Sequence, residues 1–171
     1  MDWTKTLFDV MDFRSFPSVW FWLLVAVVQS QSSYFLLGVP FDMVQRARRH
    51  GGADLDDLVA LTHINIRRLR HFTLEGGVWM VGFAFFLHTT LITLGWGFDL
   101  QMAKALELLF LPITGGAILS IMTAQEILTR DPAPERIVNL LLRQRFWRQC
   151  IGLASVFVTA LVAMFELFPR L

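Results

Sequence analysis

Four apolar stretches, each about as long as a bilayer is thick, constrain this chain more than any other feature of its sequence. They lie at residues 19–39, 77–97, 105–122 and 151–168. An α-helix rises about 1.5 Å per residue, so about 20 apolar residues cross a hydrocarbon core of about 30 Å. Only 17% of the residues are charged, below the roughly 25% of soluble domains. The sequence therefore predicts an all-α integral membrane protein whose four spans form one four-helix bundle.

The basic residues are divided unevenly between the two sides of this predicted bundle. Eleven of the 15 Lys and Arg residues lie between the first and second spans or between the third and the start of the fourth. Because cytoplasmic loops are enriched in Lys and Arg, we expect these connections to face the cytoplasm of a bacterium and both termini to face the periplasm. The predicted inner basic surface consists of Arg46, Arg48, Arg49, Arg67, Arg68, Arg70, Arg143, Arg145 and Arg148.

Two interpretations of this basic surface remain open. Membrane orientation alone accounts for the arginines. The same residues would also suit anionic lipid headgroups or an acidic soluble partner. Aromatic residues interleaved for nucleic-acid binding are lacking, so we expect no nucleic-acid partner.

The inner connections, at 40–76 and 123–150, carry helical patterns of their own. After the stop signal Gly51-Gly52, apolar residues such as Leu58 and Ile66 recur at three- and four-residue steps, which indicates an amphipathic helix. This helix would either continue through Gly76-Gly77 into the second span or bend there. The first span is expected to continue past Pro40 as helix. Residues 1–17 suit a short amphipathic helix on the outer surface, and 18–171 form the single bundle.

Polar side chains interrupt two of the spans. They are Gln29, Ser30, Ser32 and Ser33 in the first span, and Thr89 and Thr93 in the second. Polar groups in hydrocarbon must find partners, so we expect this face to meet protein or water. One interpretation is interhelical hydrogen bonding, worth about 0.6 kcal/mol per contact. The other is the lining of a pore in an oligomeric channel or small transporter.

His88 is the only histidine inside a predicted span. It could ligate a haem iron or a chlorophyll-type magnesium. A haem with two histidine ligands would need the second histidine from a partner chain, because the other histidines of this chain lie on the inner side. The alternative is a hydrogen bond to a neighbouring helix through Gln29 or Ser33. We expect Glu107 at the outer interface, where Lys104 is placed to pair with it. The single cysteine, Cys150, excludes a disulfide within the chain. No metal or cofactor is predicted.

No catalytic signature stands out from the sequence. It lacks a phosphate-binding glycine loop, zinc-ligand spacing, a serine nucleophile elbow and paired carboxylates within a span. We therefore expect no enzyme. The first hypothesis is a non-enzymatic accessory or scaffold subunit of an inner-membrane assembly, formed with itself or within a larger, for example energy-transducing, complex. The channel or transporter and the pigment- or haem-associated subunit remain as alternatives.

A resemblance adds to this interpretation. The opening Met1-Asp2-Trp3-Thr4, the stretch from Leu37 to Val44 with its following arginines, and the four-span layout resemble a group of small alphaproteobacterial membrane proteins of the Rhodobacter and Roseobacter kind. Members are often labelled "component of the SufBCD complex", the iron–sulfur cluster assembly machinery. The resemblance implies a membrane dock for soluble partners at the arginine-rich inner face. It carries over no functional residue.

Overall fold

The computed structural model of the chain describes residues 19–167, except for the side chains of 19, 31–36 and 167. Its elements are α2 (Val19–Tyr34), β1 (Phe35–Leu36), β2 (Val39–Pro40), α3 (Phe41–His50), α4 (Gly52–Ile92), the π-helical turn η1 (Thr93–Gly97), α5 (Gln101–Arg130) and α6 (Pro134–Leu167). The predicted all-α class is confirmed. The predicted interfacial helix at 1–17 lies outside the described residues.

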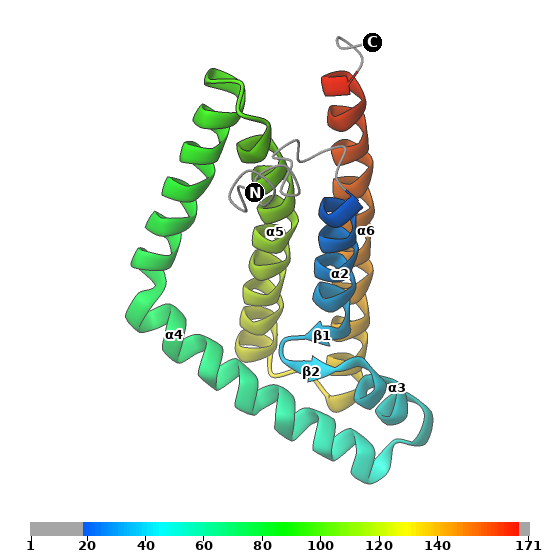
Figure 1. Cartoon of the computed structure of the whole chain (residues 1–171). Coiled ribbons are helices and arrows are strands. Elements are labelled where there is room, and N and C mark those ends of the chain that lie inside the picture. Colours follow the sequence, from blue (N-terminus) through cyan, green and yellow to red (C-terminus); the bar gives the residue numbers. More distant parts are fainter. Residues whose placement is uncertain (1–18, 168–171) are drawn as a thin grey trace, which may run out of the picture.

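Three helical segments are long and apolar enough to cross a membrane. They are Gly52–Gly97, Gln101–Arg130 and Pro134–Glu166. The apolar part of α2, Trp20–Ser30, is shorter. In Figure 1, α2, α5 and α6 run beside one another, while the first half of α4 passes across their lower ends and its second half rises to join α5. Three of the four predicted spans are thus found as helices of membrane length, by length and composition.

The first predicted span differs from the structure. Its helix ends at Tyr34, and the chain then forms a small antiparallel hairpin in which Leu36 pairs with Val39. The two turn residues, Leu37 and Gly38, have φ values of 51° and 75°, as a two-residue hairpin requires. The prediction that helix continues past Pro40 is wrong, because Gly38 favours this turn and Pro40 is the extended N-cap of the separate helix α3.

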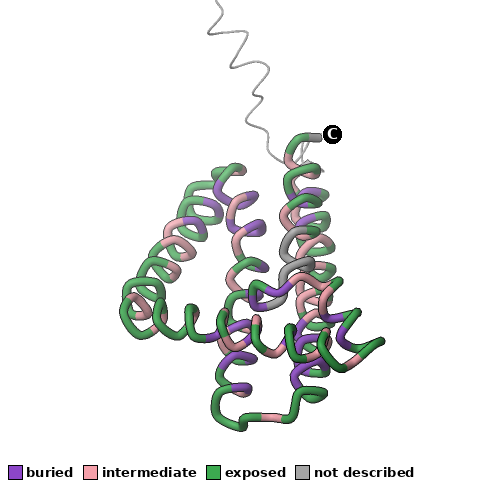
Figure 2. Tube along the Cα trace, turned by 90° about the horizontal axis from the view of Figure 1, so that it is seen from below, coloured by how far each residue is buried: buried purple, intermediate pink, exposed green. Residues whose placement is uncertain are grey.

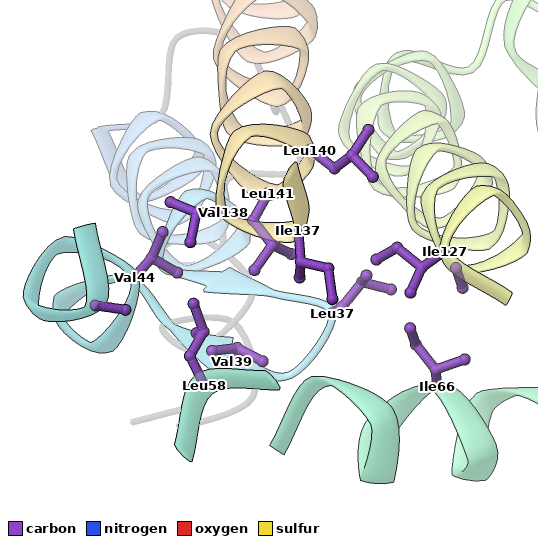
Figure 3. Close-up of a cluster of buried hydrophobic side chains, with 12 residues drawn as sticks. Leu37, Val39, Val44, Leu58, Ile66, Ile127, Ile137, Val138, Leu140 and Leu141 are labelled. Carbon is purple, nitrogen blue, oxygen red and sulfur yellow. The ribbon is translucent and has the colours of Figure 1, made fainter. Parts of the chain in front are cut away.

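The two predicted inner connections pack against each other in one apolar core, shown in Figure 3. Its buried residues are Leu37, Val39, Val44, Ala47, Leu58, Ile66, Ala124, Ile127, Ile137, Val138, Leu140 and Leu141. The amphipathic pattern is confirmed, because Leu58, Thr62 and Ile66 are the buried positions in the first half of α4. Both alternatives given for Gly76-Gly77 hold in part. The helix continues through the pair without interruption, and Figure 1 shows that α4 bends sharply between its two halves.

The membrane-length segments show the opposite polarity. Large apolar side chains such as Trp79 (83% exposed) and Phe85 (72% exposed) point outward from α4. Figure 2 shows few buried residues along the second half of this helix. Several ionisable side chains instead lie between helices, among them Lys104 and Glu107. Apolar groups outside and polar groups inside suit a hydrocarbon solvent.

Gly95 of η1 is buried and packs closely against Lys104 of α5. A Cβ atom built on it would lie 3.0 Å from Cγ and 3.1 Å from the backbone nitrogen of Lys104. We expect Gly95→Ala to lower the free energy of unfolding by about 1–3 kcal/mol, because backbone must shift to admit the methyl group.

The midpoint of thermal unfolding in detergent measures this effect. Gly97→Ala is the matched control, since its Cβ would meet only Thr93 Cγ2, at an ordinary 3.8 Å. Equal midpoints for the two variants would show that η1 and α5 do not pack as tightly as described.

Candidate functional site

Three clusters of polar side chains lie between the membrane-length helices. The middle cluster centres on His88, roughly halfway along the apolar part of α4. Its Nδ1 lies 2.9 Å from both carboxylate oxygens of Glu107, and its Nε2 lies 2.9 Å from Oγ1 of Thr114. The side chains of His88 and Glu107 are only 17% and 6% exposed. This cluster joins α4 to α5.

The three groups of the middle cluster satisfy one another chemically. A neutral imidazole that donates from Nδ1 to the Glu107 carboxylate accepts at Nε2 from the Thr114 hydroxyl. In a protonated imidazole both nitrogens donate, and Glu107 supplies the opposite charge. Both ring nitrogens are engaged in either state, so ligation of a haem iron or a magnesium would require one of these hydrogen bonds to break. Among the described residues, no group of three His, Cys, Asp or Glu side chains could hold a metal ion.

The partners of His88 differ from those expected. The sequence predicts a bond to a neighbouring helix through Gln29 or Ser33, but the structure supplies Glu107 and Thr114 from α5. Glu107 is buried between helices rather than exposed at the interface. One signal could have found this pair. In an antiparallel pair of helices, residues equally far from the connecting turn lie at the same level. His88 precedes the turn residue Asp99 by about as many residues as separate Asp99 from the midpoint of Glu107 and Thr114.

The outer cluster surrounds Lys104, whose side chain is 7% exposed. Its Nζ donates to Asp99 Oδ1 and to Glu166 Oε1. Gln101 Nε2 donates to the second oxygen of Glu166 over 3.3 Å. The predicted partner of Lys104 was Glu107, which meets His88 instead. The cluster joins the start of α5 to the end of α6.

The inner cluster surrounds Arg148, which the sequence assigns to the inner basic surface. Its Nη2 donates to the carbonyl of Gly116 over 3.0 Å and to Oγ of Ser120. Gln144 Nε2 donates to the same hydroxyl over 3.0 Å. A Cβ atom on Gly116 would lie 3.7 Å from Cζ of Arg148, an ordinary contact, so the guanidinium packs directly beside this glycine. Arg148 therefore joins α6 to α5 and lies partly buried between them.

Most other arginines of the predicted basic surface are exposed, and two of the set, Arg143 and Arg145, contact side chains of other helices. Those exposed on α3 and α4 are Arg46, Arg48, Arg49, Arg67, Arg68 and Arg70. Arg143 is exposed and contacts Glu126 of α5. The guanidinium of Arg145 lies 3.3 Å from the centre of the Phe41 ring, a cation–π contact that ties α6 to α3.

The residues predicted to line a path lie in separate places. Gln29 borders a small cavity with Pro112, Gly116 and Arg148, against α5 and α6. Thr89 and Thr93 line a shallow groove on α4 with Phe85 and Phe86. Ser30 is exposed, and the side chains of Ser32 and Ser33 lie outside the described part of the chain. The structure does not bring the described members of this set together.

Comparison of the chain with protein-family models, with curated proteins and with solved structures finds no match. Function is therefore inferred from the three clusters and the surfaces around them. Each cluster joins two helices at a different level, so the clusters fix α4, α5 and α6 relative to one another.

Proposed function

We propose that this chain is a multi-pass protein of the bacterial inner membrane that acts as a non-enzymatic accessory or scaffold subunit of a membrane assembly. The assembly is a homo-oligomer or a larger complex. The observation that carries this proposal is the uncovered second half of α4. Only 6% of an apolar 18-residue window of Gly52–Gly97 is buried within the chain, against 11% for α6 and 39% for α5.

The membrane location is supported by the polarity of the helices and by the arginines. Ionisable groups lie between the three membrane-length helices, and apolar side chains face outward. The arginine-rich elements α3 and the first half of α4 share the end of the molecule that we assign to the cytoplasm. With both termini in the periplasm, the chain must cross the membrane an even number of times, so α2 is a span in addition to the three membrane-length helices. Its 16 residues extend about 24 Å, a mismatch that local bilayer thinning accommodates at modest cost.

The composition of the uncovered face favours a protein partner over lipid alone. Thr89 and Thr93 are one helical turn apart and exposed, with Phe85 and Phe86 beside them in the same groove. Small and hydroxyl-bearing residues spaced by four allow a second helix to approach closely within a membrane. We call Phe85, Phe86, Thr89 and Thr93 the α4 contact face. The middle cluster holds this face in position by bracing α4 against α5.

Photo-crosslinking from a single position tests the proposal. A benzoylphenylalanine replacing Phe86 should give adducts with a second copy of the chain or with another membrane polypeptide, because the α4 contact face meets that partner. The matched position is Leu153 on α6, which is 75% exposed and should give lipid adducts only. Lipid adducts alone from both positions would contradict the assembly role. Release of the chain from membranes by alkaline carbonate would contradict the membrane location.

A further inference from the structure

A groove of about 440 Å³ lies on the concave side of the bend in α4, where the two halves of this helix face α5 and α6. Its walls come from α4, α5, α6 and the hairpin turn Leu37-Gly38. Asn65, Arg68 and Phe72 come from the first half of α4, Met80 follows the bend, Ala117 belongs to α5 and Arg148 to α6. In the orientation proposed above, the groove lies where the cytoplasmic arm of α4 meets its membrane-spanning half, at the level of the inner lipid headgroups.

One end of the groove is polar and positively charged. Arg68 is exposed there, and Arg148 borders the same space from α6. The Nδ2 donor of Asn65 is buried and has no hydrogen-bond partner among the described residues. The described side chains that line the groove include no carboxylate. The exposed guanidinium of Arg68 is complementary to an anion with several acceptor oxygens, and Arg148, held by Gly116 and Ser120, adds positive charge beside it.

The other walls of the groove are apolar. Phe72 and Met80 are 63% and 52% exposed, and they stand on either side of the bend. Leu69 and Ile121 complete this surface, and Met80 belongs to the uncovered second half of α4. A free anion or a hydrophilic peptide would leave these side chains in contact with water. An occupant with an anionic head and a long apolar tail would cover both parts of the groove.

We propose that this groove binds an anionic glycerophospholipid, with its phosphate on Arg68 and its acyl chains along Phe72 and Met80. The site rests on the membrane location proposed above. Its headgroup would contact the arm of α4 while its chains fill the space beside α5. An arginine next to an anionic lipid surface contributes about 1 kcal/mol, so one direct contact changes affinity about fivefold or more.

Native mass spectrometry of the purified full-length protein tests the site. The protein in detergent is titrated with phosphatidylglycerol and with phosphatidylcholine of the same acyl chains. Wild type should retain phosphatidylglycerol preferentially. Arg68→Gln should lose this preference about fivefold, whereas Arg67→Gln should keep it, because Arg67 is equally exposed but does not line the groove.

A second variant tests the apolar part without changing charge. Ala117→Phe fills the groove from α5 and should lower retention of both lipids. Three results would overturn the proposal: equal retention of the two lipids by wild type, equal loss in the two arginine variants, or displacement of phosphatidylglycerol by inorganic phosphate. Resistance to carbonate extraction is measured in parallel. A protein that resists extraction yet shows no lipid preference rejects the lipid site and leaves the membrane location standing.

Discussion

Lys104→Met is expected to lower the free energy of unfolding by about 3–5 kcal/mol, because it leaves Glu166 as an uncompensated charge between helices. Methionine keeps most of the apolar stem of lysine, so the loss reports the charge rather than the packing. Glu166 is 18% exposed, and its other described contact is the long bond from Gln101. Unfolding by SDS in mixed micelles, followed by circular dichroism, measures the change.

Two further variants separate the buried part of this cluster from its exposed part. Asp99 also contacts Lys104 but is 79% exposed, so Asp99→Asn should cost less than about 1 kcal/mol. Adding Glu166→Gln to Lys104→Met should restore at least half of the loss, because no lone charge then remains. If Lys104→Met destabilises the protein no more than Asp99→Asn does, the outer cluster is solvated and does not hold α5 to α6.

The second large effect is expected at the middle cluster. A double-mutant cycle of His88→Ala and Glu107→Ala should give a coupling energy of about 1.5–3 kcal/mol, the range for hydrogen bonds to charged groups. Both carboxylate oxygens of Glu107 lie 2.9 Å from Nδ1 of His88, and both side chains are largely buried. The same SDS unfolding measurement applies to all four proteins of the cycle.

Thr114→Val provides the neutral comparison for this cycle. It removes one hydroxyl contact to the same ring and should cost about 0.6 kcal/mol, the average for such contacts in membranes. Additive losses from His88→Ala and Glu107→Ala would show that the two side chains do not interact as described. A strong coupling would instead support a rigid brace that positions the α4 contact face.

The sequence predicted those parts of the fold that depend on one helix at a time. The helical patterns of 40–76 and 123–150 and the buried face at Leu58 and Ile66 follow from local periodicity. The end of α2 was missed because apolar length alone favours continued helix to Val39. The turn at Leu37-Gly38 depends on residues far along the chain, because Leu37 packs in the core that also contains Ile127 and Ile137.

The polar clusters could be predicted only in part. Periodicity shows that His88, Lys104 and Arg148 must find partners if they lie within membrane-length helices. It does not show which helix lies opposite. Lys104 was expected to pair along its own helix, but its partners come from the turn before α5 and from the end of α6. Arg148 was assigned to the surface because its place in the sequence did not reveal that the Gly116 carbonyl and the Ser120 hydroxyl of α5 lie opposite it.

The inner core of Figure 3 also bears on how the chain reaches its final form during synthesis. Val39 and Val44 are among the first of its members to leave the ribosome, and Ile137 and Leu141 are among the last. Chains are made from the N-terminus, and contacts between distant residues form only when both are present. The apolar side chains of the hairpin and α3 therefore remain uncovered until α6 has been synthesised. Before that point the nascent chain is most susceptible to aggregation, to proteolysis and to binding by a chaperone.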